Sequence, residues 1–261
     1  MRVGLSNPAK ANKMSRFRSR YGSFGIGGGW TPAIKTLVIA CAIGFLIQIF
    51  DTFAGTPGSP SFTYKFGLVP QDVTQRYYFW QVVTYIFLHG GFFHILFNMF
   101  GLYMFGSELE ATWGTREFTK FFFICGIGAA LTSIVASPHS SVPIIGASGA
   151  IFGLLLAYGV LFPNRLIYLY MIIPIPAKWF VVIFGAITFL SAINATQTGV
   201  AYVAHLGGML FGFIYLKGSR IIPDVRNRYD RWQRNRLRRK FEVYYNDRRR
   251  NEDDQHKWRR Y

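Results

Sequence analysis

Ser148 lies in a run of small residues, Gly146-Ala147-Ser148-Gly149-Ala150, at the start of an apolar segment. Two interpretations fit a hydroxyl in such a run. In the first, the small residues let two membrane helices approach closely, and the serine bonds a neighbouring carbonyl. In the second, Ser148 is a nucleophile, which requires a base, an oxyanion site and water at the same depth. The rest of the sequence has to decide between helix packing and catalysis.

The other polar side chains inside apolar segments are few: His89, His94, Asn98, Asn194 and His205, with Gln48 and Glu108/Glu110 near helix ends. His94 and Asn98 are four residues apart, so they share one helix face and could simply satisfy each other. His205 could likewise be a structural histidine that bonds a carbonyl. However, the small residues around it, Ala204 and Gly207-Gly208, would let its helix press against the helix of Ser148. The imidazole would then supply the base that a serine nucleophile needs.

A carboxylate that could complete a catalytic triad is not expected near these groups. The glutamates of the central region lie roughly 20 Å from His94 by helix rise, and the aspartates lie at or beyond the outer membrane edge. These acidic residues are Glu108, Glu110, Glu117, Asp51 and Asp72. We therefore predict a Ser148–His205 dyad whose imidazole is held by packing rather than by an acid.

No pattern for a metal ion or a cofactor accompanies these residues. Cys41 and Cys125 each lie in an apolar run, as buried free thiols do, and neither has a partner at metal-ligand spacing. The glycines of residues 25–29 lack the preceding strand that a phosphate-binding loop needs. We expect neither a cofactor nor a metal.

The composition is unusual for a soluble domain but fits a membrane protein with basic ends. Of the 261 residues, 51% are hydrophobic and 18% aromatic, yet the formal net charge is +17. Seven of the twelve acidic residues lie beyond residue 220, and the middle of the chain is poor in charge.

Six apolar stretches could cross a bilayer as helices. The first could also be the core of a signal peptide, but it is long for one and no convincing cleavage site follows. Residues 166–176 are apolar but broken by two prolines, and we expect them at the membrane interface. The fold class predicted is an all-α membrane protein, a six-transmembrane-helix bundle, with spans at 33–50, 84–107, 118–136, 146–162, 177–194 and 199–217.

The domain organisation follows from these spans. Residues 31–217 form the six-helix domain, with a long first connection at about 51–79. Residues 1–30 form a basic N-terminal tail, and residues 218–261 form a basic C-terminal tail.

The distribution of Lys and Arg predicts the orientation. Residues 1–35 hold seven of them and residues 217–261 hold sixteen, whereas the connections after the odd-numbered spans hold only Lys65 and Arg76. Because cytoplasmic segments carry such an excess, both termini are expected in the cytoplasm and the first connection outside. The second, fourth and sixth helices then enter from outside, which puts His94, Asn98, Ser148 and His205 in the outer half of the membrane. Polar groups there are costly, and we see no reason other than function for three helices to place them at one level.

The C-terminal tail mixes arginines with aromatic residues. It could be a solvated charged helix, a helix on the anionic inner leaflet, or, third in rank, a nucleic-acid-binding segment. The partners expected are the lipid bilayer, including anionic inner-leaflet lipids, and no nucleic acid.

At these residues the chain resembles the rhomboid intramembrane serine proteases. The matching pieces appear in family order over residues 30–217 and are specific in combination, although each alone is weak. They are Trp80-Gln81, His89, His94-Ile95-Leu96-Phe97-Asn98, Glu110, Gly114, Gly146-Ala147-Ser148-Gly149 and Ala204-His205-Leu206-Gly207-Gly208.

The resemblance implies a role for each matched residue. Ser148 would be the nucleophile and His205 the general base. The His94 and Asn98 side chains and the Ser148 backbone N–H would form the oxyanion hole. The remaining matched residues, His89, Glu110 and Gly114, would be structural. The implied function is cleavage of transmembrane helices of membrane-protein substrates near their extracytoplasmic ends. The compact six-helix form suggests the bacterial inner membrane, with an organelle membrane as the alternative.

Two positions depart from the family pattern. Gln81 stands where many members have arginine, which puts the polar anchoring of the first connection in doubt. Phe152 stands where a tyrosine often stacks under the histidine; its ring should still stack, without a hydroxyl.

Two other classes of function compete with a protease. A non-proteolytic membrane adaptor would bind helices without cutting them, but inactive rhomboid relatives usually lack the serine or the histidine. A transporter with a polar site at the membrane midplane would be expected to show inverted repeats and broken helices. No repeat is visible in the sequence, and the polar groups lie off-centre.

Overall fold

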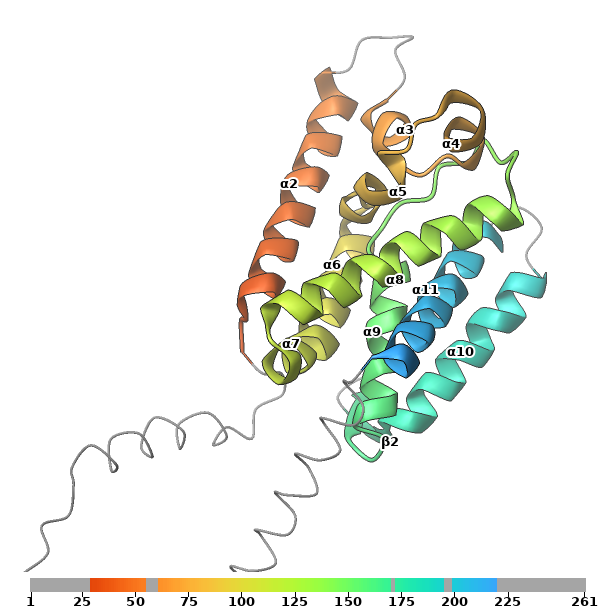
Figure 1. The fold of residues 1–261 in the computed structure, drawn as a ribbon. Coiled ribbons are helices and arrows are strands. Elements are labelled where there is room, and N and C mark those ends of the chain that lie inside the picture. The colour runs from red at the N-terminus through yellow and green to blue at the C-terminus, as the bar shows by residue number, and fades with distance from the viewer. Residues whose placement is uncertain (1–28, 55–60, 170–171, 195–198, 220–261) are drawn as a thin grey trace, which may run out of the picture.

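The computed structural model describes residues 29–54, 61–169, 172–194 and 199–219. The predicted basic tails lie almost wholly outside these residues. The described part is mostly helical, and its longer helices gather into one bundle (Figure 1). These helices are α2 (Pro32–Ala54), α6 (Phe92–Gly101), α8 (Thr115–Ala136), α9 (Ser148–Leu161), α10 (Ala177–Asn194) and α11 (Gly199–Gly218).

Helix α9 lies at the centre of the bundle. It packs against α8, α10, α11 and the π-helical segment η2 (Leu102–Gly106). Residues are buried all around its circumference, as expected of a helix that is apolar on every face. By contrast, α2 and α10 lie at opposite edges in Figure 1 and expose many large apolar side chains, which suits contact with lipid.

Two helices of the described part, α2 and α8, are long and apolar enough to cross a membrane. A third span results if the bent pair Gln81–Phe87 and Phe92–Trp113 is counted as one. Helices α9 and α10 are apolar but shorter. The chain is thus an integral membrane protein by these criteria, while the count of six spans stays a prediction.

The second predicted span, 84–107, is not one continuous helix. The segment comprising α5 (Gln81–Thr84) and the 3-10 turn η1 (Tyr85–Phe87) makes an angle of 97° with the segment that begins at Phe92. Between them, Leu88 is extended and two glycines, Gly90 and Gly91, follow His89. From Phe92 the chain runs through α6, η2 and α7 (Ser107–Trp113). The apolar pattern did not reveal this break because apolar residues continue on both sides of it.

The first connection contains short helices, although it was predicted only as a long loop. In Figure 1, α3 (Phe62–Phe66) and α4 (Pro70–Arg76) cover one end of the bundle beside α5. Pro70 is the first residue of α4, where a missing N–H costs nothing. Residues 55–60 of this connection lie outside the described part.

The proline-broken piece before α10 is a β-hairpin, which the all-α prediction missed. Strand β1 (Leu166–Leu169) pairs antiparallel with β2 (Ile173–Pro176). The two prolines of β2 are tolerated because each strand of a two-stranded hairpin has a free edge. The hairpin leads directly into α10, whose first N–H, that of Ala177, donates to the Arg165 carbonyl at 2.8 Å. Its predicted interfacial position stays a prediction.

Candidate active site

Ser148 is the first residue of α9 and follows a tightly held turn. Gly146 adopts a φ of +118°, a conformation that L side chains rarely adopt. Its N–H donates to the Tyr85 carbonyl at 2.9 Å, and Ile144 pairs with Leu68 of the first connection through two backbone hydrogen bonds. The turn before Ser148 is therefore fixed by the bent segment and by the first connection together.

His205 of α11 reaches Ser148 directly. Its Nε2 lies 2.7 Å from the Ser148 Oγ. The ring of Phe152, one helical turn after Ser148, stacks on the imidazole with centroids 4.3 Å apart and 4° between the planes. The stacked phenyl ring limits rotation of the imidazole, and the residue needs no hydroxyl to do so.

Close contact between α9 and α11 makes this approach geometrically feasible. A Cβ added at Gly208 would overlap the carbonyl oxygen of Gly149, and one added at Gly153 would lie 3.0 Å from the Gly208 carbonyl oxygen. Glycine at these positions removes the side chains that would separate the helices. The small-residue packing and the serine–histidine contact considered from sequence are thus both present.

His94 of α6 lies beside the same turn. A Cβ added at Gly146 would lie 2.8 Å from the His94 Nε2 and 3.8 Å from the Ser148 Oγ. The Gly90 N–H donates to the His94 Nδ1 at 3.1 Å. Because an acceptor nitrogen of neutral imidazole carries no proton, this bond assigns the proton to Nε2. His94 therefore directs an N–H toward the space beside Ser148.

The Asn98 amide bonds the backbone of its own helix, one turn before it. It is 6% exposed, and its Nδ2 donates to the His94 backbone carbonyl at 2.8 Å. Its Oδ1 is buried without a protein partner among the described residues. His89 lies nearby, 2% exposed, with its ring centroid 5.3 Å from that of His94. Asn98 and His89 thus both lie next to His94.

The acidic side chains of the described part bond groups other than the serine and the histidine. Asp51 accepts from the Phe62 N–H at 2.7 Å, and Asp72 pairs with Arg76 at 3.4 Å. Glu108 accepts from Arg165 and Tyr158, and Glu117 accepts from Tyr215. Glu110 accepts from Thr31, Ala33, Ile34 and Thr115. This arrangement agrees with a dyad.

Glu110 and Gly114 have structural surroundings. Glu110 is buried, and its carboxylate accepts the N–H groups of Ala33 and Ile34 at 2.9 and 3.1 Å. It thereby caps the start of α2, where helix N–H groups lack partners. Gly114 has a φ of +87° at the junction of α7 and α8.

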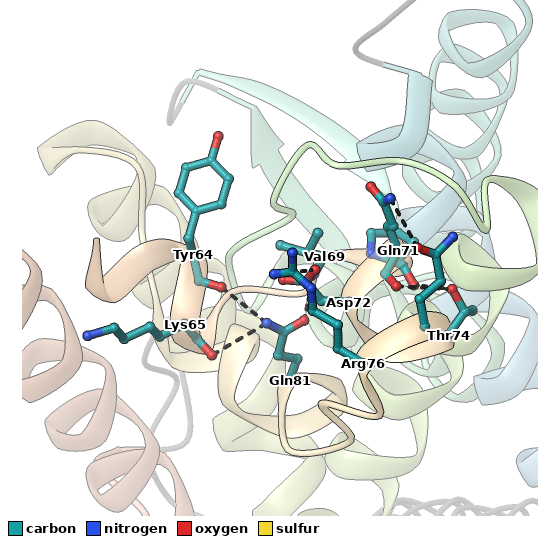
Figure 2. Close-up of polar contacts among 10 residues, drawn as sticks. Tyr64, Lys65, Val69, Gln71, Asp72, Thr74, Arg76 and Gln81 are labelled. Atoms are coloured by element: carbon teal, nitrogen blue, oxygen red, sulfur yellow. Dashed lines mark hydrogen bonds and ion pairs between the residues drawn. The ribbon is translucent and has the colours of Figure 1, made fainter. Parts of the chain in front are cut away.

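Gln81 anchors the first connection, which removes the doubt raised by the missing arginine. Its buried amide accepts from the Val69 N–H at 2.9 Å and donates to the carbonyls of Tyr64 and Lys65 at 3.1 and 3.4 Å. Figure 2 shows the Gln81 side chain between these backbone groups. One amide thus joins the residues on both sides of the turn between α3 and α4.

One polar residue near the site was undervalued from sequence. The sequence indicates Gln48 of α2 only as a polar group near a helix end, yet it is 8% exposed and accepts from the backbone N–H of His89. The signal was an amide inside an otherwise apolar helix, which is costly unless it is bonded.

As for metals, the described residues contain no group of three or more His, Cys, Asp or Glu side chains placed to hold an ion. Cys41 and Cys125 are buried free thiols.

Comparisons with known proteins show which family the chain is similar to. A family model described as the Rhomboid domain matches residues 76–219. The chain is 30% identical over 187 residues to "Rhomboid protein 1, mitochondrial" of Saccharomyces cerevisiae, covering 69% of this chain and 52% of the relative. It is 34% identical over 137 residues to "Putative rhomboid protease YdcA" of Bacillus subtilis, covering 52% of this chain and 64% of the relative.

A second Bacillus subtilis protein, "Rhomboid protease GluP", is 33% identical over 185 residues, covering 70% of this chain and 34% of the relative. The chain spans between about a third and two thirds of the length of these curated relatives. The family model covers more than half of the 261 residues and includes Ser148, His205, His94 and Asn98. The chain therefore belongs to the rhomboid family.

Proposed function

We propose that the chain is an intramembrane serine endopeptidase that cleaves transmembrane helices near their extracytoplasmic ends. The observation that carries this proposal is the 2.7 Å contact between the His205 Nε2 and the Ser148 Oγ at the start of the central helix. The protease names of the Bacillus relatives support it.

Ser148 is the nucleophile in this proposal, and His205 is its base. His205 takes the hydroxyl proton as the Oγ attacks the scissile carbonyl, and later returns that proton to the leaving amine. Phe152 keeps the imidazole in the orientation that both steps require. No acid among the described residues orients the imidazole, since their carboxylates bond other groups.

The oxyanion of the tetrahedral intermediate would form beside Gly146. The His94 Nε2–H and the Ser148 backbone N–H are the donors available there. Asn98 contributes its second amide N–H once the substrate carbonyl is present. Losing one such donor typically costs about 10² to 10³ in rate, so we expect Asn98→Ala to keep residual activity.

The membrane arrangement proposed has six spans within residues 31–217 and both termini in the cytoplasm. The helices α2, α8, α9, α10 and α11 coincide with predicted spans within a few residues, and the bent stretch through α7 takes the place of the second. The concentration of Lys and Arg at both chain ends supports the orientation. The bacterial inner membrane stays a prediction, because the relatives include mitochondrial and plant proteins.

The substrate proposed is a membrane protein whose helix enters from the lipid and unwinds near its outer end. A hydrogen-bonded helix shields its carbonyls, so unwinding must precede attack. The first connection and α10 would control entry, since α10 is at the edge of the bundle (Figure 1). Anionic inner-leaflet lipids remain the proposed contacts of the basic tails.

The test compares two serine variants of the full chain in liposomes that contain a model transmembrane substrate. Ser148→Ala should reduce cleavage to background and abolish labelling by a fluorophosphonate. Ser133→Ala is the matched control, because the Ser133 hydroxyl donates within α8, to the Ala129 carbonyl at 3.0 Å. This variant should keep both cleavage and labelling. Cleavage by Ser148→Ala at the wild-type rate would reject the proposal. Substrate binding without cleavage or labelling would indicate a membrane adaptor.

A further inference from the structure

Gln48 is a buried amide near the end of α2 that approaches the first connection. It is 8% exposed in a helix of mainly apolar residues. A polar side chain in such a place is costly unless its hydrogen-bonding groups are satisfied. Both ends of the Gln48 amide are bonded, and each bond goes to a different segment.

The two bonds set the orientation of the amide. The Gln48 Nε2 donates to the Thr63 Oγ1 of α3 at 3.0 Å. The Gln48 Oε1 accepts from the backbone N–H of His89 at 2.8 Å. The Thr63 hydroxyl thus accepts from the amide nitrogen, so that the amide oxygen faces the break before α6.

The break needs such partners because its backbone is not helical. Leu88 is extended, so the N–H groups that follow have no helical carbonyl to bond. Side chains accept from the next two N–H groups instead. The His89 N–H donates to the Gln48 Oε1, and the Gly90 N–H donates to the His94 Nδ1 at 3.1 Å.

The second of these bonds decides what His94 can offer to a substrate. With Nδ1 as acceptor, the ring proton is on Nε2, which lies beside Gly146. If the Gly90 N–H moved away, the ring could take the other tautomer and present a lone pair where a donor is required. The position of the 89–90 backbone therefore controls a donor of the oxyanion hole.

We propose that Gln48 is a positioning residue for His94. By holding the His89 N–H, Gln48 fixes the backbone that aims the Gly90 N–H at the His94 Nδ1, and so keeps Nε2–H directed to the oxyanion. Through Thr63, the same amide links this donor to α3 of the first connection. The inference rests on the proposed protease function.

The test is a double-mutant cycle on the reconstituted full chain. Gln48→Leu should lower kcat by about 10- to 100-fold with little change in KM, as expected when a catalytic group is misplaced. In a His94→Ala background, Gln48→Leu should change kcat by less than about twofold, because the group through which it acts is gone. Thr36→Val is the control, since the exposed Thr36 hydroxyl of the same helix donates to the Pro32 carbonyl at 3.0 Å, twelve residues before Gln48, and it should leave kcat unchanged.

A second measurement does not depend on activity. Ring-nitrogen NMR of ¹⁵N-histidine-labelled protein should show His94, identified by its loss in His94→Ala, with the proton on Nε2. Gln48→Leu should add a population with the proton on Nδ1, and Thr36→Val should not. An unchanged His94 tautomer in Gln48→Leu, or a full additional loss of kcat in the His94→Ala background, would overturn the inference. Failure of the protease proposal would appear instead as wild-type protein that neither cleaves nor labels, and the tautomer would still test Gln48.

Discussion

The rings of Phe152 and His205 lie parallel, 4° apart in plane and 4.3 Å between centroids. Phe152 is on α9, four residues after Ser148, so one helix supplies both the hydroxyl and the surface on which the imidazole rests. Any shift of α11 along α9 would disturb the stacking and the 2.7 Å Ser148–His205 contact together. The orientation of the imidazole thus depends on the packing of two helices.

Removing the phenyl ring should slow the reaction without preventing it. Aromatic pairs contribute about 0.5–1.5 kcal/mol beyond their buried area, so Phe152→Ala should lower kcat about 2- to 10-fold. Phe152→Tyr keeps the ring and should stay near the wild-type rate. Cleavage kinetics in liposomes measure both variants. An unchanged kcat in Phe152→Ala would mean that stacking does not orient His205.

Adding one methyl group at Gly146 should disrupt the site. In Gly146→Ala the Cβ would lie 2.8 Å from the His94 Nε2, and the φ of +118° would be strained. We expect a loss of about 1–2 kcal/mol in stability from the backbone conformation and loss of most cleavage from displacement of His94. Gly114→Ala separates the two effects, because Gly114 also has a positive φ but no atom within 4 Å of an added Cβ. If folded Gly114→Ala protein lost active-site labelling as fully as Gly146→Ala, displacement of His94 would not explain the loss of activity in Gly146→Ala.

The contact between α9 and α11 should depend on Gly208. A methyl group there would overlap the Gly149 carbonyl oxygen, so Gly208→Ala must push the helices apart and separate Ser148 from His205. We expect fluorophosphonate labelling to fall at least tenfold while the protein remains helical by circular dichroism. Gly218→Ala, at the end of the same helix with open space around it, should label normally. Equal labelling of the two variants would contradict the role given to close packing.

The first connection should lose stability when its central amide is removed. Gln81→Leu leaves the Val69 N–H and the carbonyls of Tyr64 and Lys65 without this partner, at a cost of about 1–3 kcal/mol for each buried group left unsatisfied. Thermal unfolding should therefore begin at a lower temperature. Gln71→Leu is the matched control, since the Gln71 Nε2 donates to the Gln75 Oε1 at an exposed position, at 3.2 Å. A similar melting temperature for both variants would show that Gln81 does not anchor the connection.

Much of the fold could be predicted because its signals are local. Apolar stretches revealed most helices of the described part within a few residues, since a lipid-facing or central helix must be apolar along its length. The break at Leu88–Gly91 and the hairpin β1–β2 were missed. Apolar residues flank the break on both sides. The two prolines of residues 166–176 indicate that no helix continues there, but not that the segment pairs with itself as two strands.

For the candidate site, the sequence alone determined which side chains were available for chemistry. Ser148, His94 and His205 were conspicuous because polar groups are rare in apolar segments, and small residues indicated where helices approach closely. Only the tertiary structure decided that the Ser148 and His205 side chains lie 2.7 Å apart, that Gln81 replaces an arginine as anchor, and that Gln48 holds the backbone before His94. Each of these contacts joins residues between 12 and 57 positions apart. Such pairs are set by how helices pack and where the backbone bends, and neither leaves a periodic trace in the sequence.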